Sequence, residues 1–150
     1  MNSSTTLLRQ GRRLQQIGVA LLLLVSFEGF IIPQLAAPQL GLSAHKLAGL
    51  QSVLLLALGL AWPKLDLSRG MSRIAFWLLI YSTFAILAAY LIGAIWGAGN
   101  ETMPQAAGAA HGSALKETVI KFVAYSSAPT GIVAFALILL GLRLRADNAM

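Results

Sequence analysis

Four apolar stretches dominate the pattern of hydrophobic and polar positions along the chain. They cover residues 14–32, 47–62, 74–99 and 122–142, and each is close to or above the roughly 20 residues that a helix needs to cross a bilayer. Short segments rich in turn-forming residues join the first three stretches, and a longer Gly and Ala segment at 97–113 precedes the fourth. The pattern predicts an all-α integral membrane protein, an antiparallel four-helix bundle of one domain, with spans at roughly residues 14–33, 45–63, 74–98 and 115–142.

The composition supports a membrane as the solvent of this chain. Of 150 residues, 57% are hydrophobic and 11% are charged, which is more apolar material than a soluble domain of this length can bury. The chain has no cysteine, so a disulfide framework and a thiolate-bound metal are excluded. The net charge of +6 comes from residues at the edges of apolar stretches, so we expect membrane lipid and no nucleic acid as a partner.

Lysine and arginine are distributed unequally between the two sides of the predicted bundle. Eight lie on the side of both termini and the second connection: Arg9, Arg12, Arg13, Lys64, Arg69, Arg73, Arg143 and Arg145. Only Lys46, Lys116 and Lys121 lie on the other. Because positive residues stay preferentially in the cytoplasm, we expect both termini there and the protein in a bacterial inner membrane. A cleavable signal peptide is the competing interpretation of the first stretch, since small residues follow it at 36–37.

Both histidines fall on the outer side of this predicted topology. Imidazole is the usual protein ligand of haem iron and the commonest transition-metal ligand, and His45 is a better candidate than His111 in the long loop. Ala48, Gly49 and Ser52 follow His45 on the same helical stripe, where their small side chains leave room for a flat cofactor. The same stripe is also typical of helix packing in membranes, and the spacing alone leaves both interpretations open.

Two further polar residues lie within the predicted spans. Glu28 is five residues before the predicted end of the first span, roughly 7 Å below the outer boundary. Such a carboxyl group indicates either a functional site or a side chain that snorkels to the interface. Gln51 lies at the same predicted depth, so a hydrogen bond to Glu28 is feasible, although Gln51 and His45 are about 120° apart around their helix.

Tyrosines of the third stretch are candidate proton donors. Tyr90 lies near the predicted level of His45, and Tyr81 lies deeper. The alternative roles are the interfacial aromatic belt for Tyr90 and a hydrogen bond within the bundle for Tyr81.

Other residues are expected to have structural roles. Trp62 and Trp96 lie at predicted span ends and fit an aromatic belt. Glu117 and Lys121 are four residues apart on the fourth helix and are expected to form an ion pair.

Several short segments carry a family resemblance. They are GLSAH at 41–45, LALGLAWP ending at Pro63, AFWLLIY ending at Tyr81, and WGAG with the later GSAL-E-IK pattern. As a set, over roughly two-thirds of the chain, they resemble the hydroxylaminobenzene mutase family of small membrane proteins. That family is similar in turn to styrene oxide isomerases, so the resemblance implies a homotrimer with haem b near subunit interfaces and His45 as the iron ligand.

The resemblance also implies a reaction on a small aromatic substrate. An arylhydroxylamine becomes an aminophenol, or an aryl epoxide becomes an aldehyde, without an external redox partner. Haem iron would act as the Lewis acid. The resemblance implies that His45 holds the cofactor, and the small stripe adds Ala48, Gly49 and Ser52 as cofactor-binding candidates. It implies catalytic roles for Gln51, Tyr81 and Tyr90. Glu28 is a catalytic candidate from its position in the first span alone.

Some positions depart from the family, and other functions stay open. Family members typically have asparagine in place of Gln51 and often a second one near Ile86, which bears on the choice of substrate. The alternatives are a non-enzymatic membrane subunit or haem-binding protein, and a quinone or proton-coupled role built on Glu28.

Overall fold

Helices make up all the regular structure of the part of the chain that this computed structural model describes, which is residues 3–147 with the side chains of residues 4–144. The long helices are α1 (Ser3–Glu28), α2 (Pro38–Ala61), α3 (Arg69–Trp96) and α5 (Ala114–Asp147). The short ones are η1 (Ile32–Gln34), η2 (Trp62–Lys64) and α4 (Pro104–Ala107). The side chain of Arg145, one of the eight cationic residues of the topology prediction, lies outside the described side chains.

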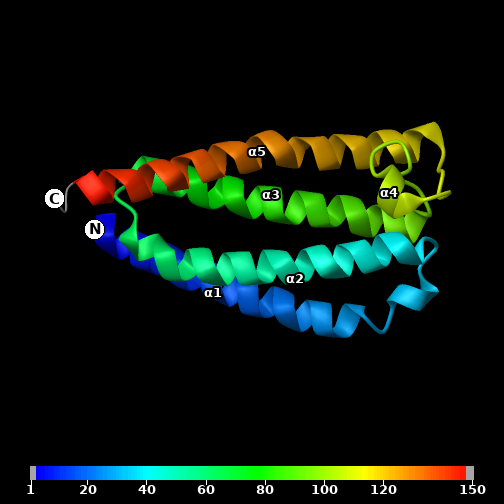
Figure 1. Cartoon of the computed structure of the whole chain (residues 1–150), viewed down its shortest axis with the longest axis horizontal. Helices are drawn as coiled ribbons and strands as arrows, with labels where there is room; N and C mark the ends of the chain where they lie inside the picture. Colours follow the sequence, from blue (N-terminus) through cyan, green and yellow to red (C-terminus); the bar gives the residue numbers. More distant parts are fainter. Residues whose placement is uncertain (1–2, 148–150) are drawn as a thin grey trace.

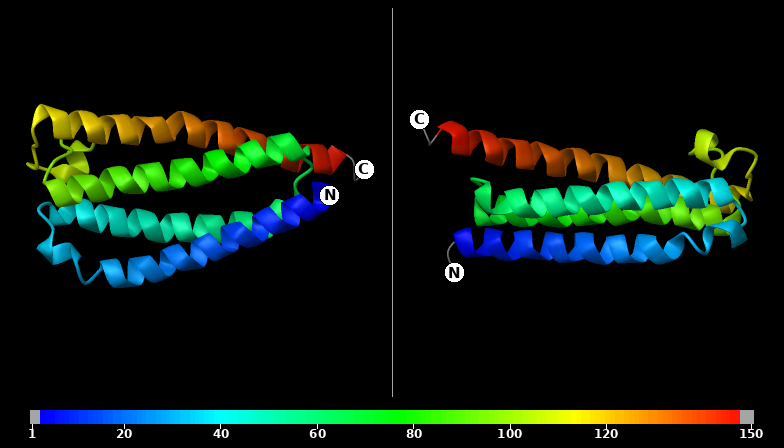
Figure 2. Two further views of the ribbon diagram at one scale, coloured as in Figure 1. Left: turned by 180° about the vertical axis from the view of Figure 1, so that it is seen from behind. Right: turned by 60° about the horizontal axis from the view of Figure 1, so that its bottom comes forward.

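The long helices lie side by side as two closely packed pairs, α1 with α2 and α3 with α5, which meet through α2 and α3 (Figure 1). The start of α1 and the end of α5 lie at one end of the molecule, which we call the terminal end. The segments containing η1 and α4 lie at the other, the loop end, and both further views agree (Figure 2). The predicted all-helical fold is confirmed.

Helix length and composition mark the protein as a membrane protein. Three helical segments of the described chain are long and apolar enough to cross a bilayer: Pro38–Lys64, Arg69–Trp96 and Ala114–Leu144. Large apolar side chains such as Phe122, Leu50 and Ile132 lie exposed on these helices, 75%, 71% and 69% respectively. In water such faces would be unfavourable, whereas lipid tails solvate them.

The first predicted span differs from the observed helix. Helix α1 is not among the three segments, because its first half carries arginines and glutamines and it ends at Glu28. We had placed Glu28 five residues inside the span, and this was wrong, since Glu28 is the last helical residue. The chain then turns at Gly29 into η1, where Pro33 lacks an N–H group and disfavours helix in the residue before it.

The second helix also begins earlier than predicted. Pro38 occupies the first turn of α2, where a missing N–H group is tolerated. His45 therefore lies about two turns inside the helix, and the prediction that it opens the helix was wrong.

Small residues bring α1 and α2 into close contact. A methyl group added at Gly18 would lie 2.9 Å from the carbonyl oxygen of Ser52, and one at Gly11 would lie 2.6 Å from that of Gly59. In each helix the two positions are seven residues apart, so they lie on one face. The helices approach as closely as small-residue packing in membranes allows.

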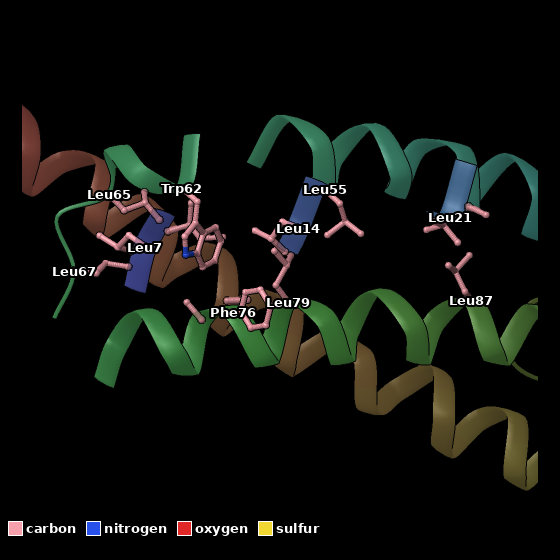
Figure 3. Packing of buried hydrophobic residues seen from close by; sticks show 14 residues of the cluster. Leu7, Leu14, Leu21, Leu55, Trp62, Leu65, Leu67, Phe76, Leu79 and Leu87 are labelled. Carbon is pink, nitrogen blue, oxygen red and sulfur yellow. The ribbon is translucent and has the colours of Figure 1, made fainter. Parts of the chain in front are cut away.

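Buried side chains from α1, α2 and α3 fill the space between the pairs (Figure 3). Leu14, Leu55 and Trp62 are fully buried, and the Trp62 ring meets Phe76 edge to face, with centroids 6.2 Å apart. The prediction of an aromatic-belt role for Trp62 was wrong. Its indole N–H donates to Gln10 Oε1 at 3.1 Å, and this bond allows the ring to be buried.

Glu117 organises the segment between α3 and α5. Its carboxylate, only 2% exposed, accepts hydrogen bonds from the backbone N–H groups of Gly99 at 2.8 Å, Gly112 at 2.9 Å and Glu101 at 3.4 Å. The expected ion pair with Lys121 is not formed, and that prediction was wrong. One buried carboxylate thus fastens both ends of the loop to α5.

We predict that Gly18→Ala destabilises the protein although alanine favours helix. The new methyl group must push Ser52 and its backbone away, at about 1–3 kcal/mol, against roughly 1 kcal/mol gained in helix propensity. Gly70→Ala is the matched control, because Gly70 is also helical and nothing lies within 4 Å of its added methyl group. Thermal unfolding in detergent should give a lower Tm for Gly18→Ala and an unchanged or higher Tm for Gly70→Ala. Equal Tm values would contradict the close contact.

We predict that Glu117→Ala loosens the loop at 97–113. It leaves buried N–H groups without an acceptor, at about 1–3 kcal/mol each, so unfolding should become easier by about 2–4 kcal/mol. Hydrogen exchange of Gly99 and Gly112 should quicken. Glu101→Ala removes the same charge from an exposed side chain and should leave both measurements unchanged.

Candidate functional site

A carboxylate and an imidazole from two helices meet near the loop end. Glu28 ends α1 and His45 lies in α2, with Glu28 Oε2 4.0 Å from His45 Nδ1. This distance is too long for a hydrogen bond but within the range of an ion pair. The prediction from sequence singled out both residues but did not pair them.

Both groups keep unused hydrogen-bonding capacity in a buried place. Glu28 Oε1 and His45 Nδ1 are buried without a hydrogen-bond partner within the described structure. The Glu28 side chain is 11% exposed and that of His45 is 32% exposed. Because Nδ1 is buried, the exposed part of the ring lies away from Glu28, on the side that carries Nε2. Buried polar atoms of this kind usually bind water, an ion or a ligand.

Helix ends and a glycine create the space around this pair. A methyl group added at Gly29 would lie 3.6 Å from His45 Cε1, so the chain after α1 packs against the ring without a side chain. The backbone leaves α1 directly after Glu28, which lets its carboxylate reach across to α2.

The small residues that follow His45 do not share one environment. Ala48 and Ser52 are buried, and Ser52 packs against Gly18 of α1, so both positions are covered by this chain. Gly49 is different, because a methyl group added there would meet nothing within 4 Å. Of the three small residues that follow His45, Gly49 is therefore the one with open space beside it.

Gln51 does not join the pair. It is half-buried on α2, and Glu28 Oε1 has no partner in the described structure, so the predicted hydrogen bond between Gln51 and Glu28 was wrong. The reason is the early end of α1, which turns Glu28 toward His45 instead.

The two candidate tyrosines lie in different environments. Tyr81 donates a hydrogen bond to Ser126 Oγ at 2.8 Å and thus connects α3 with α5. Tyr90 is half-buried and lines a cavity at the loop end. His111, the other candidate ligand, is exposed in the segment between α4 and α5.

The cavity beside Tyr90 contains residues that the sequence did not indicate. It has a volume of about 530 Å³, and Ser43, Thr102 and Pro104 also line it. The Thr102 hydroxyl is buried without a hydrogen-bond partner, as far as the structure describes the chain. His45 is not among the lining residues. No sequence signal could have found this cavity, because it depends on how α4 folds over α2 and α3.

Comparison with known proteins identifies relatives over most of the chain. A sequence model of the family described as styrene oxide isomerase matches residues 10–143. Hydroxylaminobenzene mutase HabB of Ectopseudomonas oleovorans is 45% identical over 132 residues, covering 88% of this chain and 80% of that protein. Hydroxylaminobenzene mutase HabA of the same organism is 35% identical over 125 residues, covering 83% of this chain and 93% of that protein. No solved structure matches the chain.

These relatives decide between the function classes that the sequence left open. The named mutases and the isomerase family indicate an enzyme rather than a non-enzymatic membrane subunit. The resemblance noted from the short segments is confirmed. This chain belongs to the styrene oxide isomerase family and is a membrane enzyme of the isomerase and mutase type.

Proposed function

We propose that this enzyme rearranges a small apolar arylhydroxylamine to an aminophenol, with haem b held by His45. The observation that carries the proposal is the imidazole of His45, which has one nitrogen directed at a carboxylate and the opposite side of the ring exposed. The names of the mutases HabB and HabA support the substrate class.

The environment of His45 fits a side chain that would hold haem iron. Histidines that bind metal typically present their other ring nitrogen to a carboxylate or carbonyl, which orients the ring and raises its basicity. Glu28 stands in that position, 4.0 Å from Nδ1. This arrangement leaves Nε2 as the nitrogen for iron.

The available donors favour haem over a metal ion held by side chains alone. Within the described residues, no group of three or more His, Cys, Asp or Glu side chains could hold such an ion. Haem would bring most of the iron ligands with it and would need only one side chain, that of His45, from this chain. A single histidine therefore suffices.

The open position at Gly49 supports an assembly of more than one copy. Ala48 and Ser52 are buried within this chain, so a flat group beside His45 would lie against Gly49 on the outer surface. A second copy would cover its other side, and the resemblance favours a homotrimer.

The reaction is an isomerisation in which the N–O bond breaks, a ring C–O bond forms, and the proton lost by that ring carbon is balanced by one gained at the nitrogen. Bound haem supplies a Lewis acid that polarises the N–O bond. We propose that Gln51 orients the substrate through its amide. Tyr90 handles the proton, because the Tyr81 hydroxyl is already bonded to Ser126. Apolar surroundings keep bulk water from the reacting atoms.

The topology completes the proposal. We infer an antiparallel four-helix bundle in a bacterial inner membrane, with both termini in the cytoplasm. The short apolar part of α1 spans with α2 as its partner, and Arg12 and Arg13 snorkel to the interface. Seven of the eight cationic residues counted for the cytoplasmic side have described side chains, and Arg9, Arg12, Arg13, Lys64, Arg69, Arg73 and Arg143 are all exposed.

Rearrangement of an aryl epoxide to an aldehyde is the second candidate. The family description favours it, and the same Lewis-acid chemistry would apply to a C–O bond. Turnover of styrene oxide, measured beside that of phenylhydroxylamine, separates the two candidates.

We predict that His45→Ala abolishes haem binding. The wild-type protein purified in detergent should show a Soret band, which is lost in His45→Ala and kept in His111→Ala, because His111 lies exposed in a loop. Conversion of phenylhydroxylamine to aminophenol should likewise be lost in His45→Ala and kept in His111→Ala. A Soret band of full intensity in His45→Ala would overturn the ligand assignment. If the wild type converts neither phenylhydroxylamine nor styrene oxide, both proposed reactions are overturned.

We predict that Glu28→Gln weakens haem binding without abolishing it. Loss of a carboxylate behind a ligating histidine typically lowers affinity or activity by about 10- to 100-fold. Because the imidazole becomes a weaker electron donor, the reduction potential of the bound haem should rise, which a spectroelectrochemical titration measures. Glu101→Gln removes the same charge from an exposed loop position and should leave the potential unchanged.

A further inference from the structure

Four arginines converge on one cleft at the terminal end, between α1 and α3. Arg9 and Arg13 come from α1, Arg69 and Arg73 come from α3, and all four line a cleft of about 330 Å³. In each helix the two residues are four positions apart and lie on the same face. The two helices thus direct four positive charges at one space.

The base of this cleft is rigidly built. Gln10, which also lines the cleft, is only 8% exposed. It accepts a hydrogen bond from Trp62 Nε1 at 3.1 Å and donates one to the carbonyl oxygen of Ser72 at 3.4 Å. These bonds hold α1 in register with α2 and α3 directly below the arginines.

Among the residues that the structure describes, none of those lining the cleft is acidic. Helix α3 begins at Arg69, so the positive end of its dipole adds to the four guanidinium groups. Guanidinium groups bind phosphate oxygens in pairs, and a cleft of this composition is suited to a phosphate group.

The cleft also lies at the height of lipid head groups. Arg73 directly precedes the apolar stretch of α3. Trp77, one turn further into that stretch, lines the same cleft and is 56% exposed, as is typical of tryptophans at the membrane interface. A ligand here would contact arginines at one side and an apolar ring at the other.

We propose that this cleft binds the phosphate group of an anionic phospholipid from the adjacent leaflet. Free phosphate shares the recognition chemistry, but the exposed Trp77 and the adjoining apolar stretch favour a ligand with an acyl chain. The site is independent of the isomerase site, because it lies at the start of α1 whereas Glu28 lies at its end.

The test compares lipid binding by the full-length protein and its variants in an uncharged detergent. The probes are phosphatidylglycerol, phosphatidylcholine of the same chain length, and glycerol phosphate, and native mass spectrometry measures each bound fraction. The wild type should prefer phosphatidylglycerol. Arg69→Gln/Arg73→Gln should weaken its binding by about 25-fold, since each basic residue near a membrane surface is worth roughly fivefold.

A matched control removes two positive charges from the same end of the molecule but outside the cleft. Arg12→Gln/Lys64→Gln serves this purpose, because Arg12 lines a different cleft between α1 and α2, and Lys64 is exposed. This variant should bind phosphatidylglycerol within about twofold of the wild type. Equal losses in both variants would mean general charge attraction and would overturn the proposal.

A second pair of variants guards against misfolding of the first. Arg9→Gln/Arg13→Gln removes the cleft charges contributed by α1 and should cause a similar loss. Unchanged phosphatidylglycerol binding in either folded double variant would overturn the proposal. Binding of glycerol phosphate as tight as that of phosphatidylglycerol would also overturn it, in favour of a soluble phosphate ligand.

Discussion

Close contact between α1 and α2 is the constraint on which the candidate site depends. Gly11 and Gly18 face Gly59 and Ser52, and no larger side chain fits between these backbones. Because the helices approach so closely, the end of α1 comes within reach of α2. The carboxylate of Glu28 then faces His45, although the two residues are far apart along the chain. A wider helix pair would leave the carboxylate without the imidazole.

The buried polar groups differ in whether they have hydrogen-bond partners within the chain. Glu117 is buried among backbone N–H groups that it satisfies, and Trp62 is buried because Gln10 accepts its indole proton. In both arrangements the buried polar groups find their hydrogen-bond partners within the chain, as is typical of a structural role. The atoms that stay buried without partners, on Glu28, His45 and Thr102, all lie toward the loop end. This contrast marks the loop end as the candidate binding site.

The two ends of the molecule carry different chemistry. The terminal end gathers arginines from α1 and α3 around a cleft with no acidic residue among its described lining residues. The loop end carries the pair of Glu28 and His45 and the cavity beside Tyr90. Long apolar helices separate the two, so the anionic ligand proposed for one end and the aromatic substrate proposed for the other need not interfere.

The sequence by itself determined the helical class and the apolar segments, and it singled out His45 and Glu28 as candidates, because each of these is a local property. Hydrophobic runs set helix and membrane preference, and an imidazole or a carboxyl group inside such a run stands out wherever it points. The resemblance of short segments likewise predicted the family.

Only the tertiary structure decided which of these residues meet. The end of α1 at Glu28 depends on the turn into η1, and that turn directs the carboxylate to His45 rather than to Gln51. Helical periodicity could not tell that Ser52 packs against Gly18 while Gly49 stays open, since both lie on the same stripe. Nor could it indicate that Glu117 would bind the loop instead of Lys121, because the loop N–H groups come from residues up to 18 positions away. Contacts between distant segments are set by packing, and packing is not a local property of the chain.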